Sequence, residues 1–235
     1  MDQAEFDAFA DEYQLAHARN IRASGESPAF FHEYKVADVA SALGPTSADT
    51  RLGILDFGCG VGNSLPYFRR HFPRSDITGL DVSQRSLAIA RQRFPSMGSL
   101  VQWDGVGPLP FPSKSFDVIF AACVFHHIAS NEHLALFQEW HRTLKPGGIA
   151  FVFEHNPFNP LSVRAVNTCP FDANAVLIKP RRLVSVLEQA GLADAHCRYR
   201  IFFPHALRRL RPVESYLGWL PLGAQYRVSA QRREG

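Results

Sequence analysis

The segment best suited to chemistry contains three glycines at alternate positions, Gly58, Gly60 and Gly62. It follows an apolar run at residues 52–57 and precedes a helical pattern at residues 64–72. Glycines between a strand and a helix permit a tight turn and let a ligand approach the backbone closely. The segment therefore predicts a ligand-binding loop.

The spacing of these glycines disfavours a dinucleotide. A dinucleotide loop reads G-x-G-x-x-G, and counting from Gly58 its last glycine falls on Asn63. Asp56 would also bring a negative charge towards a pyrophosphate, whereas it suits a cation such as the ammonium group of S-adenosylmethionine. The structural alternative is a glycine-rich turn that Asp56 caps locally.

Two further acids stand at the ends of predicted strands, Asp81 in the run 76–81 and Asp104 after the run 99–103. A carboxylate at the end of the second strand suits the two hydroxyls of a ribose. Open α/β sheets bind ligands at the carboxyl ends of their strands, so three acids there are more informative together than singly. Each has a structural alternative, because Asp81 can cap the next helix beside Ser83 and Asp104 can stabilise a turn.

These features resemble motif I of class I S-adenosylmethionine-dependent methyltransferases, an acid followed by Gly-x-Gly-x-Gly. The resemblance extends over about residues 50–155, and this segment is similar to methyltransferases of the ubiquinone/menaquinone type. Its further motifs are PFP at 110–112, SFDVI at 115–119, VFHHI at 124–128 and LKPGG at 144–148.

The resemblance implies S-adenosyl-L-methionine as the methyl donor and S-adenosyl-L-homocysteine as the product. It also implies that Asp104 meets the adenine amino group and that Asp117 is a structural residue at the start of a strand. The expected cofactor contacts are Asp56, Gly58, Cys59, Gly60, Gly62, Asp81, Val82, Asp104, Gly105 and Cys123. No metal ligand is among the expected site residues.

Catalytic groups are expected where the fourth and fifth strands end, facing the methyl group. Methyl transfer mainly requires positioning of the acceptor, and a general base helps where the acceptor carries a proton. His155, in the polar run 154–156 that suggests a lined pocket, is the first choice, and His127 is its rival. Tyr13 is a third candidate, because the N-terminal segment covers the cofactor in resembling proteins. The alternatives are structural histidines, a chain turn at 154–156 and a core aromatic at position 13.

The elements that position these residues alternate between apolar strands and helices, as in a parallel sheet covered on both faces. Strands are predicted at residues 52–57, 76–81, 99–103, 116–122, 149–154, 195–203 and 225–230, and helices near 64–72, 84–94, 131–144 and 181–190. Apolar residues at spacings of three and four predict two more helices before residue 44, interrupted at 24–28. We expect a Rossmann-like α/β fold with a seven-stranded, mostly parallel sheet, helices on both faces and an antiparallel last strand.

The 235 residues predict a single domain. Residues 1–44 are expected to form a helical lid and residues 50–155 the cofactor-binding core. Residues 156–235 are expected to supply substrate-side helices, C-terminal strands and an insertion. Hydrophobic residues make up 46% of the chain and charged residues 20%, which argues against extensive disorder. No pattern predicts an oligomeric state.

Charge and cysteine usage narrow the partners. The net charge is +3 with the basic excess late in the chain, which is not the footprint of a nucleic-acid binder. The four cysteines form no C-x-x-C pair, which disfavours a disulfide framework or a zinc site and suits a reducing compartment. The N-terminus lacks a signal-peptide pattern and the longest apolar run, 118–125, is too short for stable membrane insertion, so we expect a cytoplasmic protein.

Residues 204–222 combine apolar residues at helical spacing with Arg208, Arg209 and Arg211. Such a stretch can lie on a membrane surface or contact an anionic lipid-linked acceptor. The alternative, which the sequence favours, is an insertion packed on the sheet with solvated arginines.

The sequence as a whole predicts methyl transfer to the O, N or C atom of a small-molecule acceptor. Acceptor classes consistent with it are a secondary metabolite and a lipid or glycan precursor. The alternatives are a protein that binds S-adenosylmethionine without turnover and a nicotinamide-dependent oxidoreductase.

Overall fold

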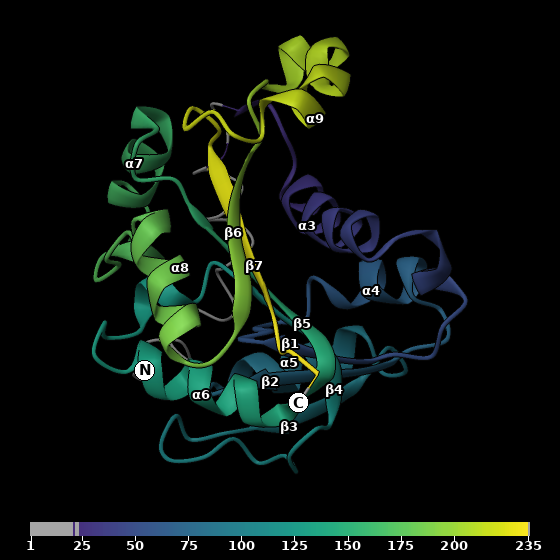
Figure 1. Ribbon diagram of the computed structural model, residues 1–235. Helices are drawn as coiled ribbons and strands as arrows, with labels where there is room; N and C mark the ends of the chain where they lie inside the picture. The colour runs from purple at the N-terminus through teal and green to yellow at the C-terminus, as the bar shows by residue number, and fades with distance from the viewer. Residues whose placement is uncertain (1–20, 22–23, 235) are drawn as a thin grey trace.

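The computed structural model of the chain describes residue 21 and residues 24–234 (Figure 1). Tyr13 and the first of the two predicted N-terminal helices lie outside the described residues. The second of these helices is present as α3 (Pro28–Leu43). The predicted lid of residues 1–44 is thus described mainly through this helix.

One seven-stranded sheet with the strand order β3-β2-β1-β4-β5-β7-β6 forms the centre of the molecule. Neighbouring strands are parallel, except that β7 is antiparallel to both β5 and β6. This arrangement confirms the predicted fold class, including the antiparallel last strand. The strands are β1 (Gly53–Phe57), β2 (Asp76–Asp81), β3 (Ser99–Gln102), β4 (Phe116–Ala122), β5 (Leu144–His155), β6 (Ala193–Arg200) and β7 (Gln225–Gln231).

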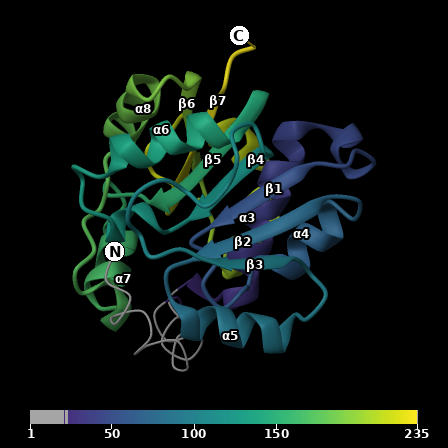
Figure 2. The ribbon, with the colours of Figure 1, turned by 90° about the horizontal axis from the view of Figure 1, so that it is seen from below.

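Helices cover both faces of the sheet (Figure 2). On one face of the sheet, α3 and α4 pack against Ile54 of β1. On the other face, α6 and α8 belong to the hydrophobic cluster that contains Leu55, the next residue of β1. Alternate residues of one strand therefore serve two separate cores, because successive side chains of a strand point to opposite faces. The other helices are α4 (Leu65–His71), α5 (Gln84–Arg93), α6 (His133–Thr143), α7 (Pro160–Asn167), α8 (Pro180–Gln189) and α9 (Glu214–Leu217). Short 3₁₀ turns lie at η2 (Pro45–Ala48), η3 (Phe125–His127), η4 (Pro170–Asp172) and η5 (His205–Val213).

Local sequence signals set the helix ends. Ser83 Oγ accepts a hydrogen bond from Ser86 N at 3.0 Å, which confirms Ser83 as the N-cap of α5. Ser27 caps α3 in the same way, and Pro28 occupies the first turn, where its missing N–H costs nothing. Gly44 follows the last residue of α3 with a φ of +86°, a conformation that favours glycine.

Several boundaries differ from the sequence prediction. Strand β5 begins at Leu144 rather than at residue 149, because Leu144 pairs with Phe116 ahead of a register shift. The LKPGG segment therefore lies within β5. Strand β6 ends at Arg200, short of residue 203, and α7 was not located in advance.

The segment 204–222 forms η5 and α9, which project beyond the sheet at the far end of β6 and β7 (Figure 1). Leu207, Leu210 and Val213, which belong to the apolar set of this segment, are 47%, 45% and 47% exposed. The prediction that this segment packs its apolar side on the sheet is therefore wrong for these residues. No helix within the described residues is both long enough and apolar enough to cross a membrane.

Candidate active site

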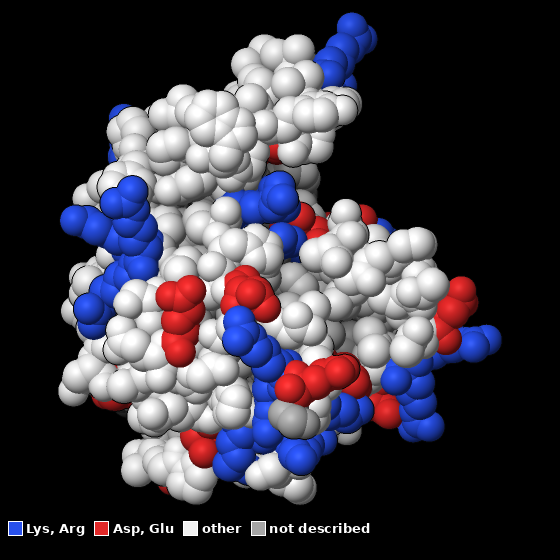
Figure 3. All heavy atoms as spheres, in the orientation of Figure 1, with Lys and Arg blue, Asp and Glu red and all other residues white. Residues whose placement is uncertain are grey.

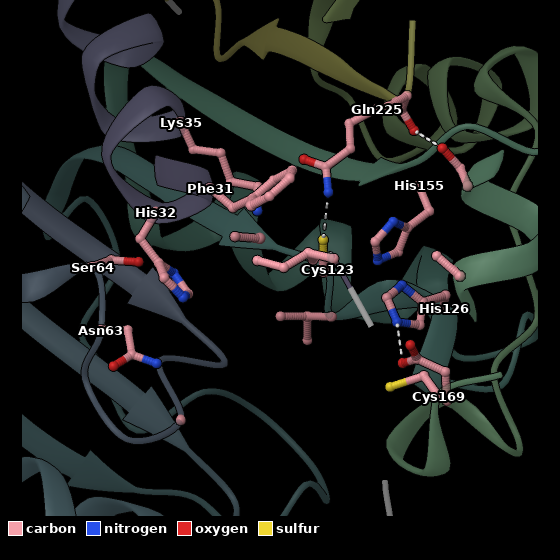
Figure 4. Close-up of a pocket in the computed structure, with 18 of the residues that line it drawn as sticks. Phe31, His32, Lys35, Asn63, Ser64, Cys123, His126, His155, Cys169 and Gln225 are labelled. Carbon is pink, nitrogen blue, oxygen red and sulfur yellow. Dashed lines mark hydrogen bonds and ion pairs between the residues drawn. The ribbon is translucent and has the colours of Figure 1, made fainter. Parts of the chain in front are cut away.

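A cavity of about 380 Å³ lies where β1, β2, β4 and β5 end and the antiparallel β7 begins. This is the edge at which open α/β sheets bind ligands. Helix α3 covers one side of it, and the chain after β6 contributes Phe202 and Phe203. Figure 4 shows the side chains that face the space.

In the glycine loop after β1, neighbouring side chains pack closely against Gly58 and Gly62, whereas the space beside Gly60 is open. A Cβ atom on Gly58 would lie 2.5 Å from Val124, and one on Gly62 would lie 2.9 Å from Leu65. A Cβ atom on Gly60 would meet nothing within 4 Å. Gly58 and Gly60 line the cavity, whereas Gly62 is not part of its wall. The open space beside Gly60 is what a ligand lying against the loop needs.

Asp56, at the base of this loop, is a buried acid with one unsatisfied oxygen among the described residues. It is 2% exposed and lines the cavity, and its Oδ2 has no hydrogen-bond partner among the described residues. Burial, with the neighbouring charge of Asp81, raises the pKa of Asp56 to about 8. An unsatisfied buried carboxylate is costly, and a cationic group in the cavity would relieve that cost. The residue therefore fits the ammonium group of S-adenosylmethionine.

Asp81 ties the loops after β1 and β2 together. Its Oδ2 accepts a hydrogen bond from Gly60 N at 2.7 Å, and its Oδ1 accepts one from Ser83 N at 2.9 Å. A carboxylate at this strand end is of the type that accepts hydrogen bonds from ribose hydroxyls. Asp81 and Val82 both line the cavity, and their contact with the cofactor stays a prediction.

Of the remaining predicted cofactor contacts, Cys59 and Cys123 line the cavity and Asp104 and Gly105 do not. Asp104 Oδ1 accepts a hydrogen bond from Val106 N at 2.9 Å, which is the turn role named as its alternative. Its contact with adenine stays a prediction.

Cys123 follows β4 with a φ of +59°, in the left-handed region that non-glycine residues seldom adopt. Burial raises its pKa, but the charges of Lys35 and His155 oppose burial and bring the pKa to about 7. Gln225 Nε2 lies 3.8 Å from its sulfur (Figure 4). The strained backbone thus presents a polarised thiol to the cavity.

The three residues of the polar run at 154–156 lie in different environments. His155 lines the cavity, while Glu154 and Asn156 are fully buried and do not. Asn156 Nδ2 donates to Pro221 O at 3.1 Å and to Gly223 O at 2.7 Å, which fixes the chain before β7. The prediction of a lined pocket is thus right for one residue and wrong for the other two.

Glu154 instead binds His126 from beneath the cavity wall. His126 Nδ1 lies 2.5 Å from Glu154 Oε2, and Phe125 N donates to Glu154 Oε1 at 2.8 Å. Burial alone would lower the pKa of His126, but Glu154 and Asp172 raise it well above the usual value. Burial raises the pKa of Glu154, but the charge and hydrogen bond of His126, with smaller contributions from His155 and Phe125 N, keep it below its usual value. The two side chains form a buried ion pair.

Asp172 lies close to both adjacent histidines, His126 and His127, which we call the HH pair. Its Oδ1 lies 3.5 Å from His126 Nε2 and 3.4 Å from His127 Nε2. His127 faces the cavity, and burial together with the charge of His126 lowers its pKa to about 4. A lowered pKa makes His127 a weak base, and the catalytic role of either histidine stays a prediction.

Helix α3 supplies cavity residues that the sequence analysis missed. Phe31, His32 and Lys35 point from α3 towards the space (Figure 4). Lys35 is 4% exposed and stands between Phe31 and Val39 at spacings of four. A lysine within an otherwise apolar helical stripe was the signal available in the sequence.

Comparison with known proteins agrees with this geometry. A family model described as "Methyltransferase domain" matches residues 55–152. The chain is 32% identical to a trans-aconitate 2-methyltransferase of Methylobacterium nodulans over 183 residues, which cover 74% of this chain and 68% of that protein. It is 36% identical over 103 residues to a protein of the same name from an Acidovorax strain, covering 42% of this chain. That match spans only 36% of the Acidovorax protein.

Two further similarities support the expected methyltransferase type and the fold. A demethylmenaquinone methyltransferase of Chlorobaculum tepidum is 36% identical over 102 residues, covering 43% of this chain and 40% of that protein. The crystal structure of a methyltransferase from Archaeoglobus fulgidus superposes with a TM-score of 0.65 at 18% identity, covering 85% of this chain and 94% of that one. The sequence match over two thirds of a relative, together with the acid and glycine loop in place, assigns the family. The chain belongs to the class I S-adenosylmethionine-dependent methyltransferases.

Proposed function

We propose that the protein transfers the methyl group of S-adenosylmethionine to a small-molecule acceptor that carries an acidic group. The observation that carries the proposal is the buried side chain of Asp56, whose Oδ2 has no hydrogen-bond partner in the described part of the chain, beside the open space at Gly60. A nicotinamide dinucleotide would offer this carboxylate no ammonium group and would bring a pyrophosphate near it. The family assignment likewise supports the methyl donor over the nicotinamide alternative.

The residues around the loop divide the binding of the donor. Asp56, Gly60 and Asp81 all line the cavity. In this proposal Asp56 binds the ammonium group, Asp81 the ribose hydroxyls, and the backbone at Gly60 the body of the ligand. When bound, the donor supplies an electrophilic methyl group on its sulfonium sulfur. The chain itself contributes orientation and a largely apolar wall that excludes water, including Phe31 and Phe202.

His155 is the proposed general base. It faces the cavity from the end of β5, beside Cys123 and opposite Lys35 of α3 (Figure 4). A base there takes the proton from the acceptor's oxygen or nitrogen as the methyl group arrives. Lys35 then offers a buried positive charge to the acceptor, which supports an acceptor with an ionised oxygen.

The names of the relatives point to the same acceptor class. Those proteins are named for trans-aconitate, a small organic acid, and for demethylmenaquinone, a quinone precursor. We therefore extend the proposal to small carboxylic acids and phenols. A carboxylic acid is already ionised near neutral pH and needs only the positive charge of Lys35, whereas a phenol keeps its proton and needs His155 as the base. Acidic and basic side chains are interspersed on the face in Figure 3, which gives no support for a nucleic-acid acceptor.

We also propose a cytoplasmic location. All four cysteines lie in the described part of the chain and none forms a disulfide. Thiols kept reduced are typical of proteins in a reducing compartment.

A turnover assay tests the proposed function. The protein is incubated with methyl-labelled S-adenosylmethionine and a panel of small carboxylic acids and phenols, and label transfer and S-adenosylhomocysteine are measured together. We expect transfer to at least one acid, with equal amounts of both products. Tight S-adenosylhomocysteine binding without transfer to any acceptor class would instead favour a binding protein without turnover.

A further inference from the structure

Three metal-ligating atoms converge on one point of the cavity wall. They are Nε2 of His126, Nε2 of His127 and Oδ1 of Asp172, and all lie within 4.8 Å of one another. The carboxylate oxygen is 3.5 Å and 3.4 Å from the two nitrogens. These separations exceed those of strong N–H···O hydrogen bonds, which are about 2.7–3.2 Å.

The same separations suit a shared ion. Zinc binds imidazole nitrogen and carboxylate oxygen at about 2.0–2.2 Å, and tetrahedral geometry then puts two ligand atoms about 3.3–3.6 Å apart. The two distances to Asp172 fall in this range. Two imidazoles with one carboxylate suit zinc and other first-row transition ions, whereas magnesium prefers a shell of oxygen atoms.

The support behind one ligand is also present. His126 offers Nε2 to the point of convergence while its Nδ1 contacts Glu154 at 2.5 Å. A carboxylate behind a ligating histidine fixes the ring orientation and the tautomer, and this arrangement accompanies most histidine metal ligands. Phe125 N donates a hydrogen bond to Glu154 at 2.8 Å, so the backbone fixes Glu154, and Glu154 in turn orients the His126 ring.

The three ligands leave room for a fourth. His126, His127 and Asp172 all line the cavity, as does His155, whose ring centroid lies 5.4 Å from that of His126. Structural zinc sites have four protein ligands, whereas catalytic sites keep one position for water or substrate. The open side of this cluster faces the space where the acceptor would lie.

We propose that His126, His127 and Asp172 bind one divalent transition-metal ion of the zinc type, with its open position towards the acceptor. Ion binding does not depend on the proposed function, and only the identity of the fourth ligand rests on it. An ion there would hold an acidic oxygen of the acceptor and help to ionise it beside His155. His127 is then a ligand rather than a base.

Cysteine spacing gave no hint of this site. The absence of C-x-x-C pairs argued only against a cysteine-based zinc site. These ligands come instead from η3 (Phe125–His127) and η4 (Pro170–Asp172), and 42 residues of the chain separate the two turns. The ion-free alternative is a charged His126 lying between two carboxylates. The experiment decides between these two states.

Zinc titration of the full chain tests the proposal. The protein is treated with a chelator, dialysed and titrated with Zn²⁺ by calorimetry, with Mg²⁺ titrated in parallel. We expect one Zn²⁺ per chain and no comparable binding of Mg²⁺. Removing a supporting residue of a metal site costs about 10–100-fold in affinity, so loss of a ligand in His127→Ala or Asp172→Asn should cost at least about 100-fold.

Matched variants keep the test decisive. His196→Ala removes an exposed histidine on β6 that is not among the cavity residues, and its zinc affinity should equal that of the wild type. Asp172→Asn preserves size, and thermal unfolding confirms that each variant is folded. The proposal is overturned if stripped wild-type protein binds no Zn²⁺, or if affinity falls in Cys123→Ser but not in Asp172→Asn. S-adenosylhomocysteine is titrated separately into the metal-free protein, so a failure of donor binding is distinguished from a failure of the metal site.

Discussion

The two halves of the cavity are built in different ways. The donor half consists of the short loops after β1 and β2, where Asp56, Gly60 and Asp81 lie within one βαβ unit. The acceptor half is assembled from η3, the end of β5, η4 and α3, which are spread over most of the described chain. The first half depends on backbone geometry and two carboxylates. The second depends on side chains whose charges are coupled.

Because the two halves are built differently, substitutions in each half should have different effects. In the donor half, Asp81 links two loops through backbone N–H groups, and the strands beneath are packed independently of it. In the acceptor half, the ion pair of His126 and Glu154 lies below the surface of the cavity. We therefore expect substitutions in the donor half to lower affinity, and substitutions in the acceptor half to lower turnover or stability.

The largest effect is expected for His155→Ala. Loss of a general base lowers kcat by about 10²–10⁴-fold, while the affinity for S-adenosylhomocysteine should be nearly unchanged. Steady-state kinetics on the accepted substrate and calorimetry measure the two quantities. His196→Ala is the control with normal turnover. Near-normal kcat in His155→Ala would show that the acceptor half works by positioning alone.

Glu154→Ala should produce the largest loss of stability. Removing one partner of a buried ion pair costs about 3–5 kcal/mol, because the other charge is left buried and uncompensated. Denaturant unfolding of the metal-free and donor-free protein measures it. Glu33→Ala is the comparison, since its pair with Arg70 is about half exposed and such pairs contribute about 1 kcal/mol or less. Equal losses in the two variants would mean that Glu154 and His126 are not a buried charged pair.

Asp81→Ala should act on the donor without unfolding the protein. Hydrogen bonds to a charged group contribute about 1.5–3 kcal/mol each, which corresponds to about 10–150-fold in affinity per bond. Calorimetry with S-adenosylhomocysteine checks this, and circular dichroism confirms the fold. An unchanged affinity would restrict Asp81 to its contacts with Gly60 and Ser83.

The sequence was sufficient for the donor half because its signals are local. Asp56 and the three glycines lie within seven consecutive residues, and each acid stands at the end of a recognisable strand. The mostly parallel sheet followed from the alternation of apolar runs and helices, and the structure confirms it, whereas the order of its strands was not predicted.

The acceptor half was less predictable because distance along the chain hides its contacts. Nothing in the pattern around Asp172 indicates that it meets the HH pair 45 residues earlier. Glu154 and His155 are neighbours in sequence, but they lie on opposite sides of the cavity wall because successive strand residues alternate. The exposure of Leu207 and Leu210 likewise depends on tertiary packing, which their helical spacing does not reveal.

The smallest effect is expected for Asp104→Ala. A single hydrogen bond to the adenine amino group is worth about 0.5–1.5 kcal/mol, or about 2–13-fold in affinity. Calorimetry under the conditions used for Asp81→Ala measures it. No change would show that the carboxylate only caps the turn through Val106 N.

The pH dependence of S-adenosylhomocysteine binding tests the central claim most directly. In the free protein Asp56 has a pKa of about 8, so it is mostly protonated below that pH. Pairing with an ammonium group requires the charged carboxylate, so binding lowers this pKa and releases a proton. Affinity should then rise between pH 6 and 8 by up to about tenfold per unit, and Asp56→Asn should abolish the rise. Binding of NAD⁺ with no binding of S-adenosylhomocysteine at any pH would contradict the account.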